Sequence, residues 1–241
     1  MDALALNCVD YGPLTKLLDI EETESRSQSV FEVLDDLRLE KVLDGVIPKP
    51  GIEKASFIMN SKPASTVLIS YLSKLNYNLN DFDNQMKHLA EVAVHLLVCT
   101  HVPGDPAYDF YLNHNLTFLN CVRILMPLFP NHHRKTLIRI YWVLTILSYI
   151  TQQRPLISKS LLEQVEVTMT WEEVKEATLK RDRKRAFDAH FLKTVQILVV
   201  FKDIWPDSQT IFLKAANKFV KEFEEWTGFG KDREMNMNTE I

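Results

Sequence analysis

The scarcity of glycine and of hairpin turns most constrains the fold of this chain. Only 6 of its 241 residues are glycine, and its one Asp-Gly pair, Asp44-Gly45, precedes Val-Ile-Pro rather than a second strand. A β-hairpin usually needs such a turn between two runs of alternating polar and apolar residues. Apolar residues instead recur at helical spacing. We therefore expect an all-α fold, a multi-helix orthogonal array or bundle around buried apolar helices.

Helix boundaries are marked by residues that cap helices. Three capping boxes are present: Ser29 with Glu32, Ser160 with Glu163, and Thr170 with Glu173. Asp105 and Pro106 predict a helix over 107–129, and an apolar stripe predicts another over 209–226, stopped by glycine. We expect one all-helical domain over residues 1–230 and a disordered tail over 231–241.

Composition excludes several classes of protein. The net charge of −4 gives no reason to expect a nucleic-acid partner. The most apolar run, Leu137–Ile150, contains Arg139 and is shorter than the roughly 18 residues of a membrane span, so we expect a buried core helix and no membrane partner. The chain has 3 cysteines without CxxC spacing and no secretory signal, which predicts reduced thiols and a cytoplasmic location.

A predicted helix over Ala186–Phe201 carries the first candidate site. His190 and Lys193 are three residues apart and share a helical face among apolar neighbours. A buried ammonium must find a partner, lose its proton or be chemically modified, unless Lys193 extends to the surface. Asp188 can either orient a histidine or cap the helix.

His114 is the second candidate. It shares a helical face with Phe110, Phe118 and Cys121, and that face should point toward the core. A lone histidine on such a face is usually a core residue, and the functional alternative is a metal ligand or a general base. The basic run over 180–185 is expected to be a solvated face.

Nucleotide-binding and hydrolase motifs are missing from the sequence. There is no GxGxxG, no GxxxxGK[ST], no GxSxG and no HExxH. The sequence therefore predicts no dinucleotide-binding domain and no serine-hydrolase or zincin site.

Two stretches resemble the questin oxidase-like family. Residues 109–117, DFYLNHNLT, are similar to the family stretch DFFLMHxxT, with Tyr111 in place of Phe and Asn113 in place of Met. Residues 187–193, FDAHFLK, resemble the stretch DGHxxK, with Ala189 in place of Gly. These are mostly fungal oxidoreductases of secondary metabolism, and some open anthraquinone-type rings of polyketides.

The resemblance implies O2-dependent oxidation or ring cleavage of an aromatic polyketide. It further implies a non-haem iron site with His114, His190 and a carbamate on Lys193 as metal ligands, and NADPH as reductant. Lys193 and Asp188 are the candidate catalytic residues. Imidazole nitrogen with carbamate oxygen forms a mixed donor set that suits iron.

The chain resembles only the carboxyl-terminal part of the family. Family members are longer at the amino end, where a stretch resembling HPLIHLGY contributes further histidines. Pairing with a missing amino-terminal segment is therefore one expectation. The competing interpretations are a catalytically inactive helical fragment or interaction module, and a metal-free carrier of a hydrophobic ligand.

Overall fold

The computed structural model describes Leu17 and residues 29–74, 81–180 and 184–229. Residues 1–16 and 18–28 of the expected domain, and the expected tail over 231–241, lie outside this part of the chain. The described helices are α2 (Val30–Arg38), α3 (Ala55–Asn60), α4 (Lys62–Leu72), α5 (Phe82–Val98), α6 (Phe110–Leu125), α7 (Asn131–Thr151), α8 (Ser160–Glu163), α9 (Trp171–Leu179), α10 (Ala189–Ile204) and α11 (Gln209–Glu222). Short 3-10 turns are η1 (Lys41–Leu43), η2 (Ile52–Lys54), η4 (Met126–Leu128), η5 (Lys184–Phe187) and η6 (Pro206–Ser208).

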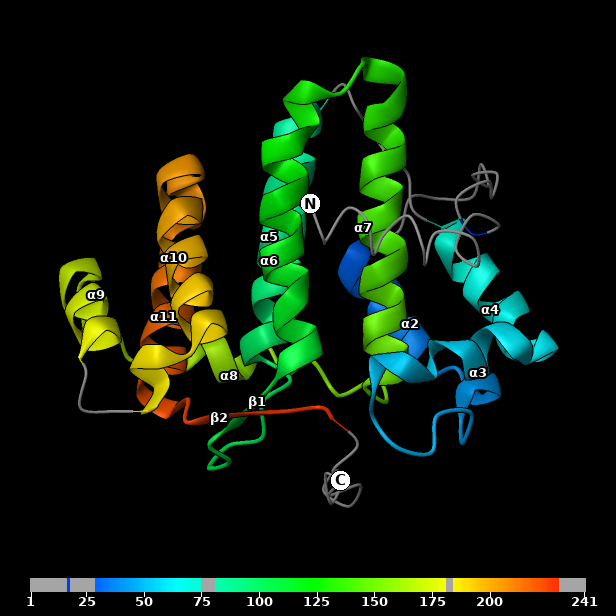
Figure 1. The fold of residues 1–241 in the computed structure, drawn as a ribbon, viewed down its shortest axis with the longest axis horizontal. Helices are drawn as coiled ribbons and strands as arrows, with labels where there is room; N and C mark the ends of the chain where they lie inside the picture. Colours follow the sequence, from blue (N-terminus) through cyan, green and yellow to red (C-terminus); the bar gives the residue numbers. More distant parts are fainter. Residues whose placement is uncertain (1–16, 18–28, 75–80, 181–183, 230–241) are drawn as a thin grey trace.

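Helices α5, α6 and α7 form the centre of the molecule (Figure 1). Helices α8 to α11 lie on one side of this centre, and α2 to α4 lie on the other. Almost every residue of the second half of α7 is buried, and the apolar faces of α5, α6, α10 and α11 contribute to the same core. The all-α prediction is confirmed, as is the interpretation of 137–150 as a core helix. In the described part of the chain, no helix is long and apolar enough to cross a membrane.

The caps explain where several helices begin. The boxes at Ser29 and at Thr170 form as predicted. The box predicted at Ser160 is wrong, since Ser160 is the first residue of α8 rather than its cap. The cap predicted at Asp105 is also wrong. Its carboxylate accepts a hydrogen bond from the Ala107 N–H, which forms a local turn.

Two short parallel strands replace parts of two predicted helices. β1 (Ala107–Asp109) pairs with β2 (Glu225–Thr227), and Tyr108 lies opposite Trp226. Helix α6 therefore begins at Phe110 rather than at Ala107, and α11 ends at Glu222 rather than at Trp226. Strand pairing, together with bonds from Glu224 and Glu225 to the Pro106 carbonyl, gives the backbone after α11 its partners.

The end of α7 is fixed without a glycine. Gln153 has φ +65° and Arg154 φ +53°, both left-handed. The Gln153 N–H donates to Ile150 O and the Arg154 N–H donates to Tyr149 O, the two bonds of a Schellman motif. This turn places the side chain of Arg154 against α2.

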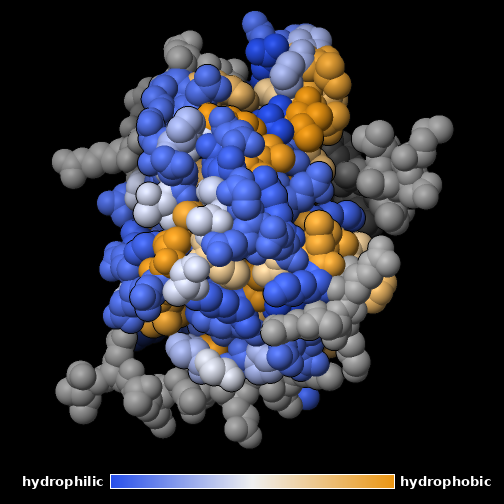
Figure 2. Space-filling view, turned by 90° about the vertical axis from the view of Figure 1, so that its left-hand side faces the viewer, coloured by the Kyte–Doolittle hydropathy of each residue, from blue (hydrophilic) through white to orange (hydrophobic). Residues whose placement is uncertain are grey.

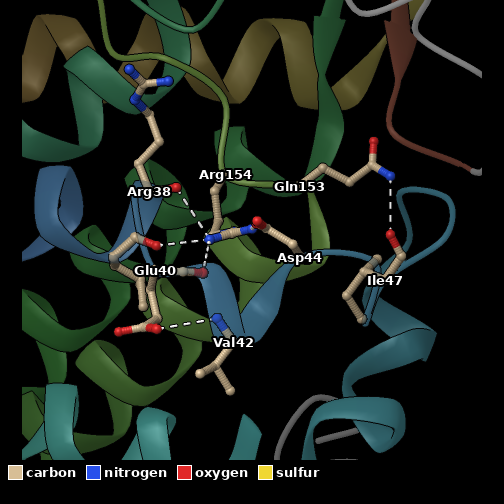
Figure 3. A network of polar contacts seen from close by, with 8 residues as sticks. Arg38, Glu40, Val42, Asp44, Ile47, Gln153 and Arg154 are labelled. Atoms are coloured by element: carbon tan, nitrogen blue, oxygen red, sulfur yellow. Dashed lines mark hydrogen bonds and ion pairs between the residues drawn. The ribbon is translucent and has the colours of Figure 1, made fainter. Parts of the chain in front are cut away.

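Arg154 holds the carboxyl end of α2 (Figure 3). Its Nη1 donates to the carbonyls of Leu37 (3.1 Å), Arg38 (3.1 Å) and Glu40 (2.7 Å), and its Nη2 lies 2.7 Å from Asp44 Oδ1. A helix leaves its last carbonyls without donors, and a cation there also favours the helix dipole. A single guanidinium therefore ties the α7 end to the α2–α4 side of the molecule.

Arg185 donates to carbonyls at the carboxyl end of α11, as Arg154 does for α2. Its Nη1 donates to Val220 O and Phe223 O, and its guanidinium lies over the Phe191 ring. The prediction that the basic run is solvated is wrong for Arg185, which is buried. The free carbonyls at the end of α11 explain why a cation is stable there.

Candidate functional site

The amino termini of α6 and α10 form the frame of the site. Asp109 caps α6, and its Oδ1 accepts bonds of 2.9 Å from the N–H groups two and three residues later. Asp188 caps α10 in the same way, with bonds of 2.8 and 2.9 Å. The two helices also share a polar contact one turn further on. There the Thr194 hydroxyl lies 2.7 Å from Asn113 Oδ1, inside the protein.

This frame brings His114 and His190 together. Their ring centroids are 5.2 Å apart, and Phe110 contacts both rings at 4.4 and 4.7 Å. His114 Nδ1 lies 2.6 Å from the Phe110 carbonyl, an acceptor only, so Nδ1 carries the proton in that bond. In the neutral ring, Nε2 then keeps a lone pair for a metal or a proton. The predicted proximity of the two histidines is present in the structure.

The surroundings of His114 favour its neutral form. Burial, the largest contribution, lowers the pKa of His114 below its usual value, and the bond to Phe110 opposes that shift. Electrostatic interactions with His190 and Lys193 lower the pKa of His114 further. A neutral imidazole is the form that binds metals and accepts protons.

Lys193 lies at the solvent side of the pair. Its side chain is exposed. Of the two alternatives that the sequence left open, the structure therefore shows the one in which the lysine extends to the surface. Its positive charge contributes to lowering the pKa of His114. A carbamate on Lys193 stays a prediction.

Asp188 uses both carboxylate oxygens for structure. Besides capping α10 through Oδ1, it accepts a 2.8 Å bond from Trp226 Nε1 through Oδ2. It thus contacts the backbone N–H of His190 and holds the β2 segment against α10. Capping was one of the two roles that the sequence left open for Asp188, and a catalytic role stays a prediction.

Aromatic side chains from the segment after α11 complete the site. Phe229 contacts Phe110 at 5.0 Å and Tyr111 at 5.6 Å, and Trp226 lies 6.4 Å from the His190 ring. Phe229 is 53% exposed, so part of its ring is open to solvent next to Phe110, which contacts both histidines. Sequence reasoning missed both residues as part of the site. The glycines at 228 and 230 indicated only the end of a helix, so no sequence pattern placed these aromatic residues at the site.

Comparison with known families identifies a matching family model. The sequence model that describes the family as questin oxidase-like matches residues 1–198, which is most of the chain and includes both histidine stretches. The chain belongs to the questin oxidase-like family. Membership suggests an oxidoreductase. No curated protein matches the chain.

The questin oxidase-like site has metal donors of the right kind but too few of them. In residues 29–74, 81–180 and 184–229, no group of three or more His, Cys, Asp and Glu side chains lies close enough to hold a metal. All 7 histidines of the chain are in these ranges, so no further imidazole can come from the other residues. The described residues therefore supply two imidazoles at this place, which are fewer donors than an iron site needs.

Gly228 lets the aromatic segment of this questin oxidase-like protein cross closely over the cap of α6. Its φ is +103°, and a Cβ there would lie 2.9 Å from Gln152 Oε1 and 3.2 Å from Asp109 Oδ1. Side chains rarely adopt this backbone conformation, and contacts below 3.0 Å force a shift. Glycine at 228 is therefore required for the position of Phe229.

Replacing Gly228 with alanine should destabilise the protein by about 2 kcal/mol and displace the aromatic segment. Gly104→Ala is the matched control, because Gly104 has φ +84° but no atom within 4 Å of the added Cβ. The control should lose only about 1 kcal/mol from backbone strain. Urea denaturation gives both values, and the near-ultraviolet circular dichroism should change for Gly228→Ala alone. Equal losses with unchanged spectra would contradict the close crossing.

Proposed function

We propose that this protein is an oxidoreductase that uses O2 to oxidise or cleave the ring of an aromatic polyketide of the anthraquinone type. The observation that carries the proposal is the contact of the two family histidines, at 5.2 Å, beside the exposed ring of Phe229. Family membership supports oxidation chemistry, and the aromatic surroundings support an aromatic substrate.

The aromatic residues would bind and orient the substrate. Flat aromatic compounds stack favourably on aromatic side chains in offset or edge-to-face arrangements. Phe229, held by Phe110 and Tyr111, offers such a surface at the mouth of the site. In the metal-free form of the proposal, where Lys193 is not a carbamate, its exposed ammonium would attract a phenolate oxygen of the same substrate. Together these residues would place a hydroxylated ring next to the histidines.

The histidines would move a proton or hold a metal. The free Nε2 of His114 can accept a proton from a phenol, which makes the ring richer in electrons and easier to oxidise. If iron is the cofactor, His114 and His190 would hold it, with Lys193 as the proposed carbamate ligand, and bound iron would supply the activation of O2. NADPH is the proposed reductant, because a monooxygenase reaction consumes two electrons beyond those of the substrate.

A non-catalytic helical protein is the second candidate. The observation that favours it is the donor set, in which the described residues supply two imidazoles and no third ligand group. In that case His114 and His190 would be half-buried structural residues, and neither metal nor substrate would bind.

Measurement of O2 uptake and metal content tests the proposal. Purified protein is loaded anaerobically with Fe(II), freed of excess metal and assayed with a hydroxyanthraquinone, with and without NADPH. We expect near-stoichiometric iron by elemental analysis, substrate-dependent O2 uptake, and a product that contains one or two added oxygen atoms by mass spectrometry. Absence of bound iron together with absence of uptake would favour the non-catalytic candidate. O2 uptake without bound iron would support the proposed oxidoreductase activity and contradict the proposed iron cofactor.

A further inference from the structure

The connection between α6 and α7 exposes a cluster of apolar side chains. We call residues 123–135 the α6–α7 tip. Its exposed large hydrophobic residues are Ile124, Leu125, Leu128 and Phe129, and Leu128 is 76% exposed. The tip lies at the end of the α6–α7 pair that is farthest from β1 and β2 (Figure 1). Pro127 in η4 and Pro130 before α7 restrict its backbone.

The charge of this part of the chain is of one sign. From Phe110 through Leu162 the sequence contains no aspartate or glutamate. The α6–α7 tip carries Arg123, Arg134 and Lys135, together with two histidines at 132 and 133. Arg123 bonds to Asn120 and Arg134 Nε to the Phe129 carbonyl, so these contacts leave both positive charges without neutralisation.

Hydrophilic and exposed apolar groups adjoin on one surface. Figure 2 shows hydrophobic and hydrophilic side chains next to each other at the top of the molecule, where Figure 1 places the α6–α7 connection. A shallow depression on the flank of α7 is lined by Phe129, His133, Thr136, Leu137 and Ile140. Helix α5 packs against α6 and begins with two carboxylates, Asp81 and Asp83. The tip itself is cationic and apolar.

We propose that the α6–α7 tip docks on the surface of an anionic lipid bilayer. Apolar side chains at a projecting tip can enter the boundary between headgroups and acyl chains, and the charges of Arg123 and Arg134 then meet anionic headgroups. One apolar contact alone binds a membrane weakly, and the cations supply the second contribution. This attachment needs no membrane-spanning helix. The expectation from the sequence of no membrane partner considered only such a span.

The charge distinguishes a lipid surface from a second copy of the chain. Two such tips in contact would bring like charges together, which opposes association. An acidic protein groove would suit the cations, but four exposed apolar side chains on a convex tip suit a fluid apolar layer better. The proposal therefore commits to anionic lipid and leaves self-association as an outcome of the test.

Vesicle sedimentation tests the proposal. The full chain is mixed with phosphatidylcholine vesicles, with or without phosphatidylserine, at low and at high NaCl. We expect sedimentation only with phosphatidylserine vesicles, and weaker sedimentation at high salt because mobile ions screen the attraction. The double variant Leu128→Ser/Phe129→Ser should bind roughly tenfold more weakly. Arg134→Gln should lose roughly fivefold.

The matched control is Leu179→Ser at the end of α9. Leu179 is 68% exposed, so it resembles Leu128 in type and exposure but lies outside the tip. It should bind vesicles like the unmodified protein. No binding to phosphatidylserine vesicles, or an equal loss in the control, would overturn the proposal. Size-exclusion chromatography that shows a dimer lost in the Leu128→Ser/Phe129→Ser variant would also overturn it in favour of self-association.

Discussion

Replacing Arg154 with methionine should lower the free energy of unfolding by about 3 kcal/mol. The guanidinium donates to three carbonyls around the end of α2, and its side chain is only 11% exposed. Methionine keeps the apolar stem but leaves those carbonyls without their charged donor. The ion pair with Asp44 contributes little to this value, because that carboxylate is largely exposed.

Urea denaturation followed by circular dichroism measures the loss. Arg134→Met is the matched control, since Arg134 bonds through Nε to the single carbonyl of Phe129 at an exposed position. It should lose less than about 1 kcal/mol. The loss in free energy of unfolding for Arg154→Lys should lie between the losses of these two variants. An ammonium keeps the charge but lacks the planar guanidinium that donates to several acceptors at once. A loss for Arg154→Met no larger than that of the control would show that α2 does not depend on this clamp.

The Arg154 clamp also shows which parts of the fold the sequence could predict. The capping boxes at Ser29 and Thr170 are local, so their residues alone predict where α2 and α9 begin. The end of α7 is different, because Gln153 occupies the left-handed position where a glycine is usual. The distant carbonyls of α2 supply the contacts that select this turn. No pattern around residue 154 indicates those carbonyls.

Long-range pairing explains the errors at the two strands. Ala107–Asp109 lies in a stretch with helical apolar spacing, and so does Trp226 at the end of the stripe on α11. Their backbone conformation is decided by pairing with each other, across more than a hundred residues of chain. Strands of three residues carry too little periodicity to be recognised alone. The helices were therefore predicted three residues too early at α6 and four too late at α11.

In the candidate site, too, some residues could be predicted from the sequence and others depend on long-range contacts. His114 and His190 were predicted from their helical faces and from two stretches that resemble the questin oxidase-like family, and the structure brings the two rings together. Trp226 and Phe229 come to the site only through β2, so sequence spacing could not place them. The sequence did not decide whether the Lys193 side chain is buried or exposed, because position 193 lies where the apolar face of α10 meets solvent. Helical spacing does not say on which side of such a boundary a long side chain ends.

Replacing either site histidine should abolish the proposed oxidation, with the rate of O2 uptake reduced roughly 100-fold or more. Glutamine is the substitution of choice for both, because it is polar and similar in length but is neither a base nor a good iron ligand. The contact between the rings predicts that the two histidines act as one unit. The double variant His114→Gln/His190→Gln should then be no less active than the less active of the two single variants.

Comparison with His88→Gln distinguishes this role from loss of stability. His88 is a half-buried histidine whose ring packs against Phe31 of α2, away from the α6 and α10 amino termini. Its variant should keep both O2 uptake and iron, even if its urea midpoint falls as far as that of His114→Gln. If iron is held by the pair, each site variant should also lose bound iron by elemental analysis. Additive losses in the double variant, or an equal loss in His88→Gln, would mean that the pair is not a catalytic unit. The ring contact would then be explained by packing around Phe110.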